Sequence, residues 1–255
     1  MLKLSDKFFI ITGAGGGIGR ETAIRFSELG ATLALLDVND NSLSGTQQAI
    51  VDRGGIAFSY VVDLTREDQV KKTIEDIVQA HQTIDGLVNI AGGSGRRHGD
   101  GPVDQCTLDG WHFTLNLNLT SMFLMCKYTI PHLQNGGSII NLSSVLGLTG
   151  NTLFATHAYA ASKGAIISMS RAMAVHYADH GIRVNVIAPG LVKTDMSARA
   201  ESNEAITTMM KHLQPLTGSI GEARAVADTA TFLASEDSKF ITGVVIPVDG
   251  GWTAQ

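Results

Sequence analysis

The chain contains few of the residues that most strongly constrain a fold. Of its 255 residues only two are cysteines and five are prolines, and charged residues make up 17%. Cys106 and Cys126 are too few for a disulfide framework, and they lack the clustered Cys/His spacing of a zinc site. We therefore expect a cytoplasmic protein, in a reducing compartment, with no metal site.

The sequence also lacks the features that nucleic acids and membranes require. Its net charge of −5 provides no basic field for nucleic acid or for an anionic lipid surface. No segment approaches the roughly 18 uninterrupted apolar residues of a membrane span, and the N-terminus enters a strand-like run without a signal peptide. Neither partner is expected. Hydrophobic residues still make up 44% of the chain, which predicts a well-buried interior and favours self-association.

What the chain does contain is an alternation of short apolar runs and segments of helical periodicity, such as residues 18–29 after the first run. Continuously apolar strands are typical of a sheet covered on both faces. The pattern predicts an α/β fold of the doubly wound Rossmann type, with a seven-stranded parallel sheet, helices on both faces and one domain over residues 1–255. Residues 92–102 and 191–219 are irregular and predict loops around a site. The expected strands are residues 7–11, 32–36, 56–62, 84–90, 138–142, 182–187 and 244–248.

A glycine-rich turn, Thr-Gly-x-x-x-Gly-x-Gly at residues 12–19, follows the first expected strand and precedes the first expected helix. Glycines at this place let the backbone approach a pyrophosphate at a helix N-terminus. A flexible surface loop is the alternative. We expect a dinucleotide to contact Gly13, Gly16, Gly17, Ile18 and Gly19.

Asp37 ends the second expected strand, 18 positions after Gly19. A carboxylate there accepts hydrogen bonds from the adenosine ribose hydroxyls and repels a 2′-phosphate. The alternative is that Asp37 only caps the following helix. Because no arginine or lysine follows in Val38 or occurs in the glycine turn between Gly13 and Gly19, we expect NAD(H) rather than NADP(H).

Tyr159 and Lys163 are four residues apart and so share one face of a helix. A free phenol has a pKa of about 10, and a nearby ammonium favours the phenolate and lowers that pKa. Of the four tyrosines, only Tyr159 has a lysine four positions later. The pair is therefore a candidate for proton transfer, although a packed ring beside a solvated lysine gives the same spacing.

Taken in order, these motifs resemble the classical subgroup of the short-chain dehydrogenase/reductase family over essentially the whole chain. Residues 89–92 are similar to the family's Asn-Asn-Ala-Gly segment, with Ile90 in place of the second asparagine, and residues 248–251 match a C-terminal signature. The resemblance implies a cofactor site that also includes Asp63, Leu64, Asn89, Ala91, Gly92, Tyr159, Lys163, Pro189, Gly190, Val192 and Thr194.

The resemblance also implies a catalytic tetrad of Asn118, Ser144, Tyr159 and Lys163. In the family, the tyrosine is the general acid or base and the serine donates a hydrogen bond to the same substrate oxygen. The lysine lowers the tyrosine pKa and binds the nicotinamide ribose, and the asparagine holds a water. Both Ser143 and Ser144 follow the fifth strand; the resemblance favours the second.

The resemblance implies hydride transfer between NAD(H) and a secondary alcohol or ketone, in a homotetramer. Alternatives are a 3-oxoacyl-carrier reductase and a non-enzymatic NAD-binding sensor.

Substrate contacts are the least determined part of the sequence. Arg96 and Arg97 either clamp an acidic substrate or are solvated, and His157 either contacts substrate or packs at a helix start. The stretch from Ser144 to Tyr159 is about two residues longer than is usual in the family, which predicts a reshaped pocket wall. Two further features are open: methionines 196, 209 and 210, expected in an apolar lid or in the core, and the Gln255 terminus, expected to bind a cation or to pack.

Overall fold

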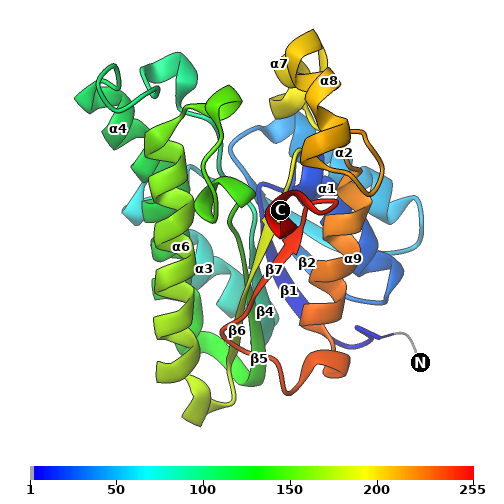
Figure 1. Cartoon of the computed structure of the whole chain (residues 1–255). Coiled ribbons are helices and arrows are strands. Elements are labelled where there is room, and N and C mark those ends of the chain that lie inside the picture. Colours follow the sequence, from blue (N-terminus) through cyan, green and yellow to red (C-terminus); the bar gives the residue numbers. More distant parts are fainter. Residues whose placement is uncertain (1–2) are drawn as a thin grey trace.

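The computed structural model describes residues 3–255, and its centre is one seven-stranded parallel sheet (Figure 1). The strand order is β3-β2-β1-β4-β5-β6-β7. The predicted fold class is therefore confirmed. The strands are β1 (Phe8–Thr12), β2 (Thr32–Asp37), β3 (Ile56–Val61), β4 (Ile84–Asn89), β5 (Leu133–Leu142), β6 (Arg183–Pro189) and β7 (Val245–Val248).

Strand β5 is the one whose extent differs most from the prediction. It begins at Leu133, which pairs with Ile84, and a register shift follows before Gly86 pairs with Ser138. Residues 134–136 between these pairs are exposed, so the first half of the strand has no apolar run. Pairing with β4 forms this part of β5 where the local pattern alone predicts none.

Helices cover both faces of the sheet (Figure 1). Successive residues of β1 point to opposite cores: Ile10 lies in the cluster with α3, α5 and α6, and Ile11 lies in the cluster with α1, α2 and α9. This is why the strands are continuously apolar. The helices are α1 (Gly17–Glu28), α2 (Asp40–Val51), α3 (Glu67–His81), α4 (Leu108–Leu115), α5 (Ser121–Thr129), α6 (His157–His176), α7 (Ala198–Glu201), α8 (Glu204–Leu213) and α9 (Ala223–Ala234).

Residues 191–219, expected as a loop, contain α7 and α8. Ile206, Met210 and Leu213 occur at helical spacing and are buried in a third apolar cluster with Val145 and Trp252. The irregular structure predicted from the local pattern was therefore wrong for α7 and α8, whereas the family resemblance implies a segment of helix and loop here. An amphipathic helix forms once it has an apolar surface to cover. In Figure 1 both helices stand above one end of the sheet.

The order of the strands reverses at β1, which lies between β2 and β4. In open parallel sheets this reversal leaves a crevice at the carboxyl ends of the strands, where ligands bind. The glycine turn, α4 and α8 all lie at that end (Figure 1). Within residues 3–255, the structure has no helix that is long and apolar enough to cross a membrane.

Candidate active site

The glycine turn packs its backbone directly against the end of β4. Gly13 has φ +67°, and a Cβ there would lie 2.9 Å from the backbone N and Cα of Ala91. A Cβ at Gly19 would collide with the carbonyl oxygen of Gly13. Thr12 joins the same two strands, because its Oγ1 accepts hydrogen bonds from Ile90 N (3.0 Å) and Ala91 N (3.1 Å). These contacts fix the backbone at the reversal point of the sheet.

Helix α1 begins at this turn without a side-chain cap. Its N-cap residue is Gly16, which makes no side-chain cap hydrogen bond, and a Cβ at Gly16 would meet nothing within 4 Å. The first N–H groups of a helix have no partners inside it and carry partial positive charge. An uncapped helix start beside open space fits the pyrophosphate of a dinucleotide.

Asp37 connects the end of β2 to the glycine turn. Its Oδ2 accepts a hydrogen bond from Gly15 N (2.9 Å), and its Oδ1 accepts one from Asn39 N (3.0 Å). The carboxylate therefore lies beside the turn, where an adenosine ribose would be held. It also stabilises the turn itself, a role that the sequence analysis did not assign.

Tyr159, in the first turn of α6, lies against Ser144, which follows β5. The short turn at Val145–Gly147 touches the α6 backbone: a Cβ at Gly147 would lie 2.7 Å from the carbonyl carbon of Lys163 and 2.9 Å from Gly164 N. Gly147 thus permits the close approach of this turn to the α6 backbone at Lys163 and Gly164. Burial raises the pKa of the Tyr159 hydroxyl to about 12, and a hydrogen bond with Ser144 offsets part of the rise.

The two serines of the pair face different groups. Ser143 Oγ donates to the main-chain oxygen of Lys163 (2.7 Å) and is buried against α6. Ser144 Oγ accepts from Leu146 N (3.2 Å) and is the hydroxyl that meets Tyr159. Of the two, only Ser144 lowers the pKa of the Tyr159 hydroxyl through a side-chain hydrogen bond.

Lys163 is buried, with its Nζ 5.4 Å from the centre of the Tyr159 ring and donating to Leu142 O at 3.0 Å. Burial lowers the pKa of this ammonium to about 8. The pKa of the Tyr159 phenol rises on balance, because burial penalises the phenolate more than the hydrogen bond with Ser144 favours it. The expectation that Lys163 lowers this pKa stays a prediction.

Asn118 occupies a π-helical turn, Asn116–Thr120, between α4 and α5. Its Oδ1 accepts from Gly93 N (3.0 Å), and its Nδ2 donates to Gly93 O and Thr114 O (2.9 Å each). A Cβ at Gly92 would lie 2.6 Å from Asn118 Oδ1 and 3.5 Å from Lys163 Nζ. The Asn118 side chain therefore holds the loop after β4 beside Lys163.

Two of the remaining predicted cofactor residues, Asn89 and Asp63, use their side chains in hydrogen bonds to other residues of the protein. The Asn89 side chain points into the core and donates to Asn141 Oδ1 (2.8 Å), so only its main chain is available at the edge of the sheet. Asp63 Oδ1 accepts from Thr65 N (2.9 Å) and Thr65 Oγ1 (2.7 Å) in the turn after β3, and Leu64 is buried.

The nicotinamide end of the predicted site lies between Gly92 and the segment after β6. Thr194 reaches the glycine turn, since a Cβ at Gly17 would lie 2.9 Å from Thr194 Cγ2. Gly190 lies against Gln214 and Asp249, and Val192 forms an isolated bridge with Gly221. The glycine turn, Asp37 and this segment together fit an extended dinucleotide.

Sequence reasoning missed two buried polar residues near the site. Gln214 Oε1 accepts from Leu191 N (2.6 Å) and its Nε2 donates to Ser219 O (2.8 Å), which ties together both ends of the α7–α8 segment. Asp100, also buried, accepts from Ala158 N. No local pattern marks either residue, because their partners are distant in sequence or depend on the folded segment.

The structure also places the residues whose roles were left open. Arg96 and Arg97 are exposed in a short 3₁₀ turn, and neither forms an ion pair with any residue from 3 to 255. His157 Nδ1 accepts from Val103 N (2.9 Å). Of the methionines, Met210 is buried, whereas Met196 is exposed and its Cε lies 4.0 Å from a Cβ built on Gly93. Gln255, at the C-terminus, donates a side-chain hydrogen bond to His212 O (2.6 Å).

A family model described as enoyl-(acyl carrier protein) reductase matches residues 13–253. A 3-oxoacyl-[acyl-carrier-protein] reductase of Thermotoga maritima is 35% identical over 98% of this chain and 99% of its own length. A cyclohexanol dehydrogenase of an Acinetobacter species is 31% identical over 99% of this chain and 97% of its own length. These matches span the whole predicted site.

Solved structures agree in fold. A short-chain dehydrogenase/reductase from Mycobacterium ulcerans superposes with a TM-score of 0.92 at 30% identity, covering 100% of this chain and 92% of its own. A blue fluorescent protein from a metagenomic library, in complex with NADPH, has a TM-score of 0.88 at 30% identity, covering 98% of this chain and 99% of its own. The chain therefore belongs to the short-chain dehydrogenase/reductase family of oxidoreductases.

Proposed function

We propose that this protein is an NAD-dependent oxidoreductase that interconverts a secondary alcohol and a ketone. The observation that carries the proposal is the meeting of Ser144 with the Tyr159 hydroxyl, with Lys163 beside the ring. The loop after β4 connects this group to the glycine turn, because Ala91 packs on Gly13 and a Cβ at Gly92 would lie 3.5 Å from Lys163 Nζ. A dinucleotide with its pyrophosphate at α1 would therefore extend along this loop toward Tyr159.

A bound nicotinamide dinucleotide would supply the hydride donor or acceptor, which leaves the protein to manage a proton. With a pKa of about 12, Tyr159 is a protonated phenol near neutral pH. It can therefore donate its proton to the oxygen of a ketone during reduction. Ser144 donates a hydrogen bond to the same oxygen, where negative charge develops.

Lys163 supports the proton transfer through its lowered pKa of about 8, which makes the ammonium a ready proton source for Tyr159 near neutral pH. During oxidation the path runs in reverse: Tyr159 first passes its own proton to uncharged Lys163, and the resulting phenolate takes the hydroxyl proton of the alcohol. The water that links Lys163 to solvent remains assigned to Asn118. Because the Asn118 amide is bonded to Gly93 and Thr114, its main chain is the proposed contact.

The preference for NAD(H) is supported by Asp37 at the end of β2. Its carboxylate faces the glycine turn through Gly15 N, so the 2′-phosphate of NADP would approach a negative charge. Val38 and Asn39, which follow, offer no positive charge to compensate. The NADPH complex of the metagenomic fluorescent protein shows that a related fold accepts the other cofactor.

An apolar substrate is supported by the walls next to Ser144. Val145, Leu146 and Phe154 pack into the third apolar cluster with α7 and α8. Cyclohexanol, named for the Acinetobacter relative, is an apolar secondary alcohol of the class that such walls suit. The exposed Arg96 and Arg97 add no support for an acidic substrate.

Reduction of a carrier-bound 3-oxoacyl group is the second candidate. It is favoured by the Thermotoga relative and by the description of the family model. A non-enzymatic sensor is disfavoured, because cofactor binding alone needs no Ser144 directed at Tyr159.

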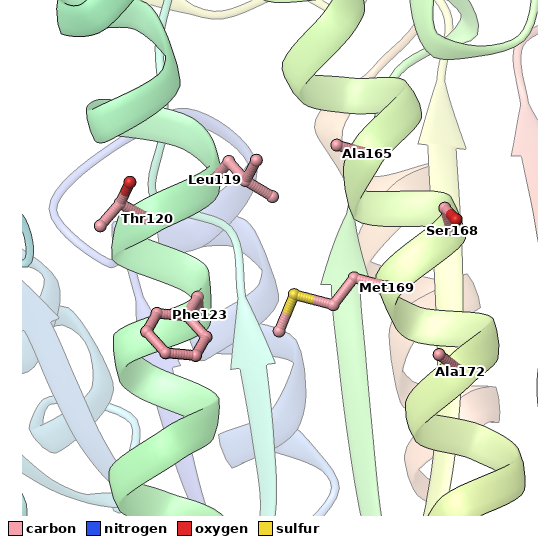
Figure 2. Close-up of a pocket in the computed structure, with 7 residues that line it drawn as sticks. All are labelled: Leu119, Thr120, Phe123, Ala165, Ser168, Met169 and Ala172. Atoms are coloured by element: carbon pink, nitrogen blue, oxygen red, sulfur yellow. The ribbon is translucent and has the colours of Figure 1, made fainter.

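A homotetramer is proposed on the basis of an open groove between α5 and α6. Figure 2 shows Leu119, just before α5, and Met169 of α6 directed toward each other across this groove, which Phe123 of α5 also lines. Phe123 is 43% exposed, and a second copy of the chain would cover it. The other lining residues are also uncharged: Thr120, Ala165, Ser168 and Ala172.

Two broader expectations also remain proposals. One domain over residues 1–255 is supported by the single sheet, which contains all the strands from β1 near the N-terminus to β7 near the C-terminus. A cytoplasmic location is supported by the unpaired Cys106 and Cys126.

The test is turnover of alcohols, ketones and a 3-oxoacyl carrier substrate with NAD(H) and NADP(H), followed by nicotinamide absorbance. We expect turnover of alicyclic or other apolar secondary alcohols with NAD. Tyr159→Phe should lower turnover by about 10²–10⁴-fold and leave cofactor binding intact. Tight NAD binding without turnover on this panel would refute the enzymatic proposal, and preference for the carrier substrate would favour the second candidate.

A further inference from the structure

Helix α6, which carries Tyr159, begins without a cap of its own. Its N-cap residue, Thr156, makes no side-chain hydrogen bond to the helix. The first N–H groups of a helix have no partners within it, and leaving such groups buried without partners is destabilising. The partners for the start of α6 must therefore come from another part of the chain.

They come from the loop that follows β4. His157 N donates to Gly101 O at 3.0 Å. Ala158 N donates to Asp100 Oδ1 and Tyr159 N donates to Asp100 Oδ2, each at 3.0 Å. Asp100 thus uses both carboxylate oxygens on consecutive N–H groups, one of which belongs to Tyr159 itself.

The carboxylate of Asp100 is buried, and the contact between the loop and α6 is reciprocal. Asp100 is 4% exposed, and a buried carboxylate is stable only where hydrogen bonds and positive charge surround it. The N–H groups and the positive end of the α6 dipole provide both. In return, His157 Nδ1 accepts from Val103 N at 2.9 Å, so residues 100–103 and 157–159 hold each other through four hydrogen bonds.

The loop that carries Asp100 is itself held on both sides. Asp100 N donates to Gly95 O at 3.1 Å, and Gly95 packs so closely on α4 that a Cβ there would collide with Thr114 Oγ1. Earlier in the loop, Asn118 holds Gly93. The loop therefore holds Asp100 against α4, in a defined position from which it bonds to the start of α6.

We propose that Asp100 is a positioning residue for Tyr159: its carboxylate fixes the main chain of Tyr159 and thereby the place of the phenol hydroxyl over the reacting oxygen. This inference rests on the proposed function. Asp100 is bonded to the backbone of α6, and its assigned effect is on the geometry of proton transfer. Displacement of a reacting group by 1 Å can lower a rate by about 10²-fold.

The test compares Asp100→Ala and Asp100→Asn with Asp104→Asn. Asp104 is an exposed carboxylate in the same loop, and its side chain makes no hydrogen bond within the described part of the chain, residues 3–255. We expect Asp100→Ala to lower kcat by about 10²-fold, with the Kd for the dinucleotide unchanged, since Asp100 bonds to Gly95, Ala158 and Tyr159 and not to the glycine turn or Asp37. Asp100→Asn should be intermediate, because an amide retains one acceptor and turns a donor toward the second N–H.

The same substitutions in a Tyr159→Phe background separate positioning from general damage. If Asp100 acts through the Tyr159 hydroxyl, Asp100→Ala should leave the residual rate of Tyr159→Phe nearly unchanged. An equal loss in both backgrounds would overturn the proposal, as would a kcat for both Asp100 variants equal to that of Asp104→Asn. If Asp100→Ala does not fold, Asp100→Asn decides by the same comparison.

A readout without turnover distinguishes failure of this inference from failure of the proposed function. Amide hydrogen exchange at Ala158 and Tyr159 should be slow in the unmodified protein and in Asp104→Asn, and faster in Asp100→Asn. Unchanged exchange would overturn the tether even in an active enzyme. If exchange becomes faster in Asp100→Asn but the unmodified protein turns over no alcohol or ketone, the hydrogen bonds from Asp100 to α6 are supported and the proposed function is refuted. The proposed role of Asp100 in that reaction is then refuted as well.

Discussion

The ammonium of Lys163 lies over the face of the Tyr159 ring, 5.4 Å from its centre, and is bonded to the main-chain oxygen of Leu142 rather than placed against the phenol oxygen. Burial acts on both groups and favours the uncharged form of each. It raises the phenol pKa to about 12 and lowers the ammonium pKa to about 8. Near neutral pH the pair therefore consists of a protonated phenol and an ammonium group that loses its proton more readily than a free lysine.

The pH dependence of the two reaction directions should follow from this pair. Reduction needs the phenol proton and a charged Lys163 to replace it, so we expect its kcat to fall as pH rises through about 8. Oxidation needs a proton acceptor and should become faster over the same range. Steady-state rates in both directions from pH 6 to 10 measure this, and a reduction rate that stays flat above pH 9 would contradict it.

Replacing Lys163 should make the protein more stable. The folded pKa of about 8 lies below the unfolded value of 10.5, so at pH 7 the fold bears the cost of burying a charge. That cost disappears as pH rises from about 8 to above 10.5. We expect Lys163→Met to raise the free energy of unfolding by about 1–3 kcal/mol at pH 7.

Urea unfolding at pH 7 and pH 10 measures the difference, which should shrink at the higher pH. Lys239→Met, at an exposed position, is the control and should change stability by less than about 0.5 kcal/mol. A Lys163→Met protein that is less stable at pH 7 would show that the Leu142 hydrogen bond outweighs the burial cost.

The two adjacent serines should give different phenotypes. Ser144→Ala removes the hydroxyl that meets Tyr159, and we expect a loss of about 10²–10³-fold in kcat with little change in stability. Ser143→Ala removes the bond to the Lys163 carbonyl and should mainly lower stability, by about 1 kcal/mol. Kinetics and thermal unfolding of both variants separate the roles, and equal losses of kcat would count against the assignment to Ser144.

Asp37 should govern the choice between NAD and NADP. We expect Asp37→Ala to weaken NAD binding, because the ribose contact and the bonds to Gly15 N and Asn39 N are lost, and to relax discrimination against NADP. The control is Asp40→Asn, which removes a charge of the same sign at an exposed position at the start of α2. The measurement is the ratio of Kd values for the two dinucleotides, and an unchanged ratio in Asp37→Ala would reject the assignment.

The groove between α5 and α6 should be an interface between copies of the chain. Phe123→Glu places a charge in this apolar groove and should dissociate the proposed tetramer, whereas Val51→Glu, at an exposed position on α2, should not. Light scattering reads the mass directly. A monomeric mass for the unmodified protein would refute the tetramer, and an unchanged mass in Phe123→Glu would place the contacts elsewhere.

The sequence by itself determined the fold class and the family of this protein. Apolar runs, helical periodicity and the glycine turn act over windows of five to about fifteen residues, and the backbone responds to them locally. Gly13 illustrates this: its left-handed conformation and its closeness to Ala91 follow from a turn that only glycine permits.

The tertiary structure alone decided which groups surround the candidate site. Asp100 meets Tyr159 N across 59 positions of sequence, and the burial that sets the pKa values of Tyr159 and Lys163 depends on how η4, the turn at Val145–Gly147, packs on α6. The same is true of α8, which is helical over an apolar cluster drawn from three distant segments. Local patterns specify elements, but desolvation and hydrogen bonding across the fold depend on which elements meet.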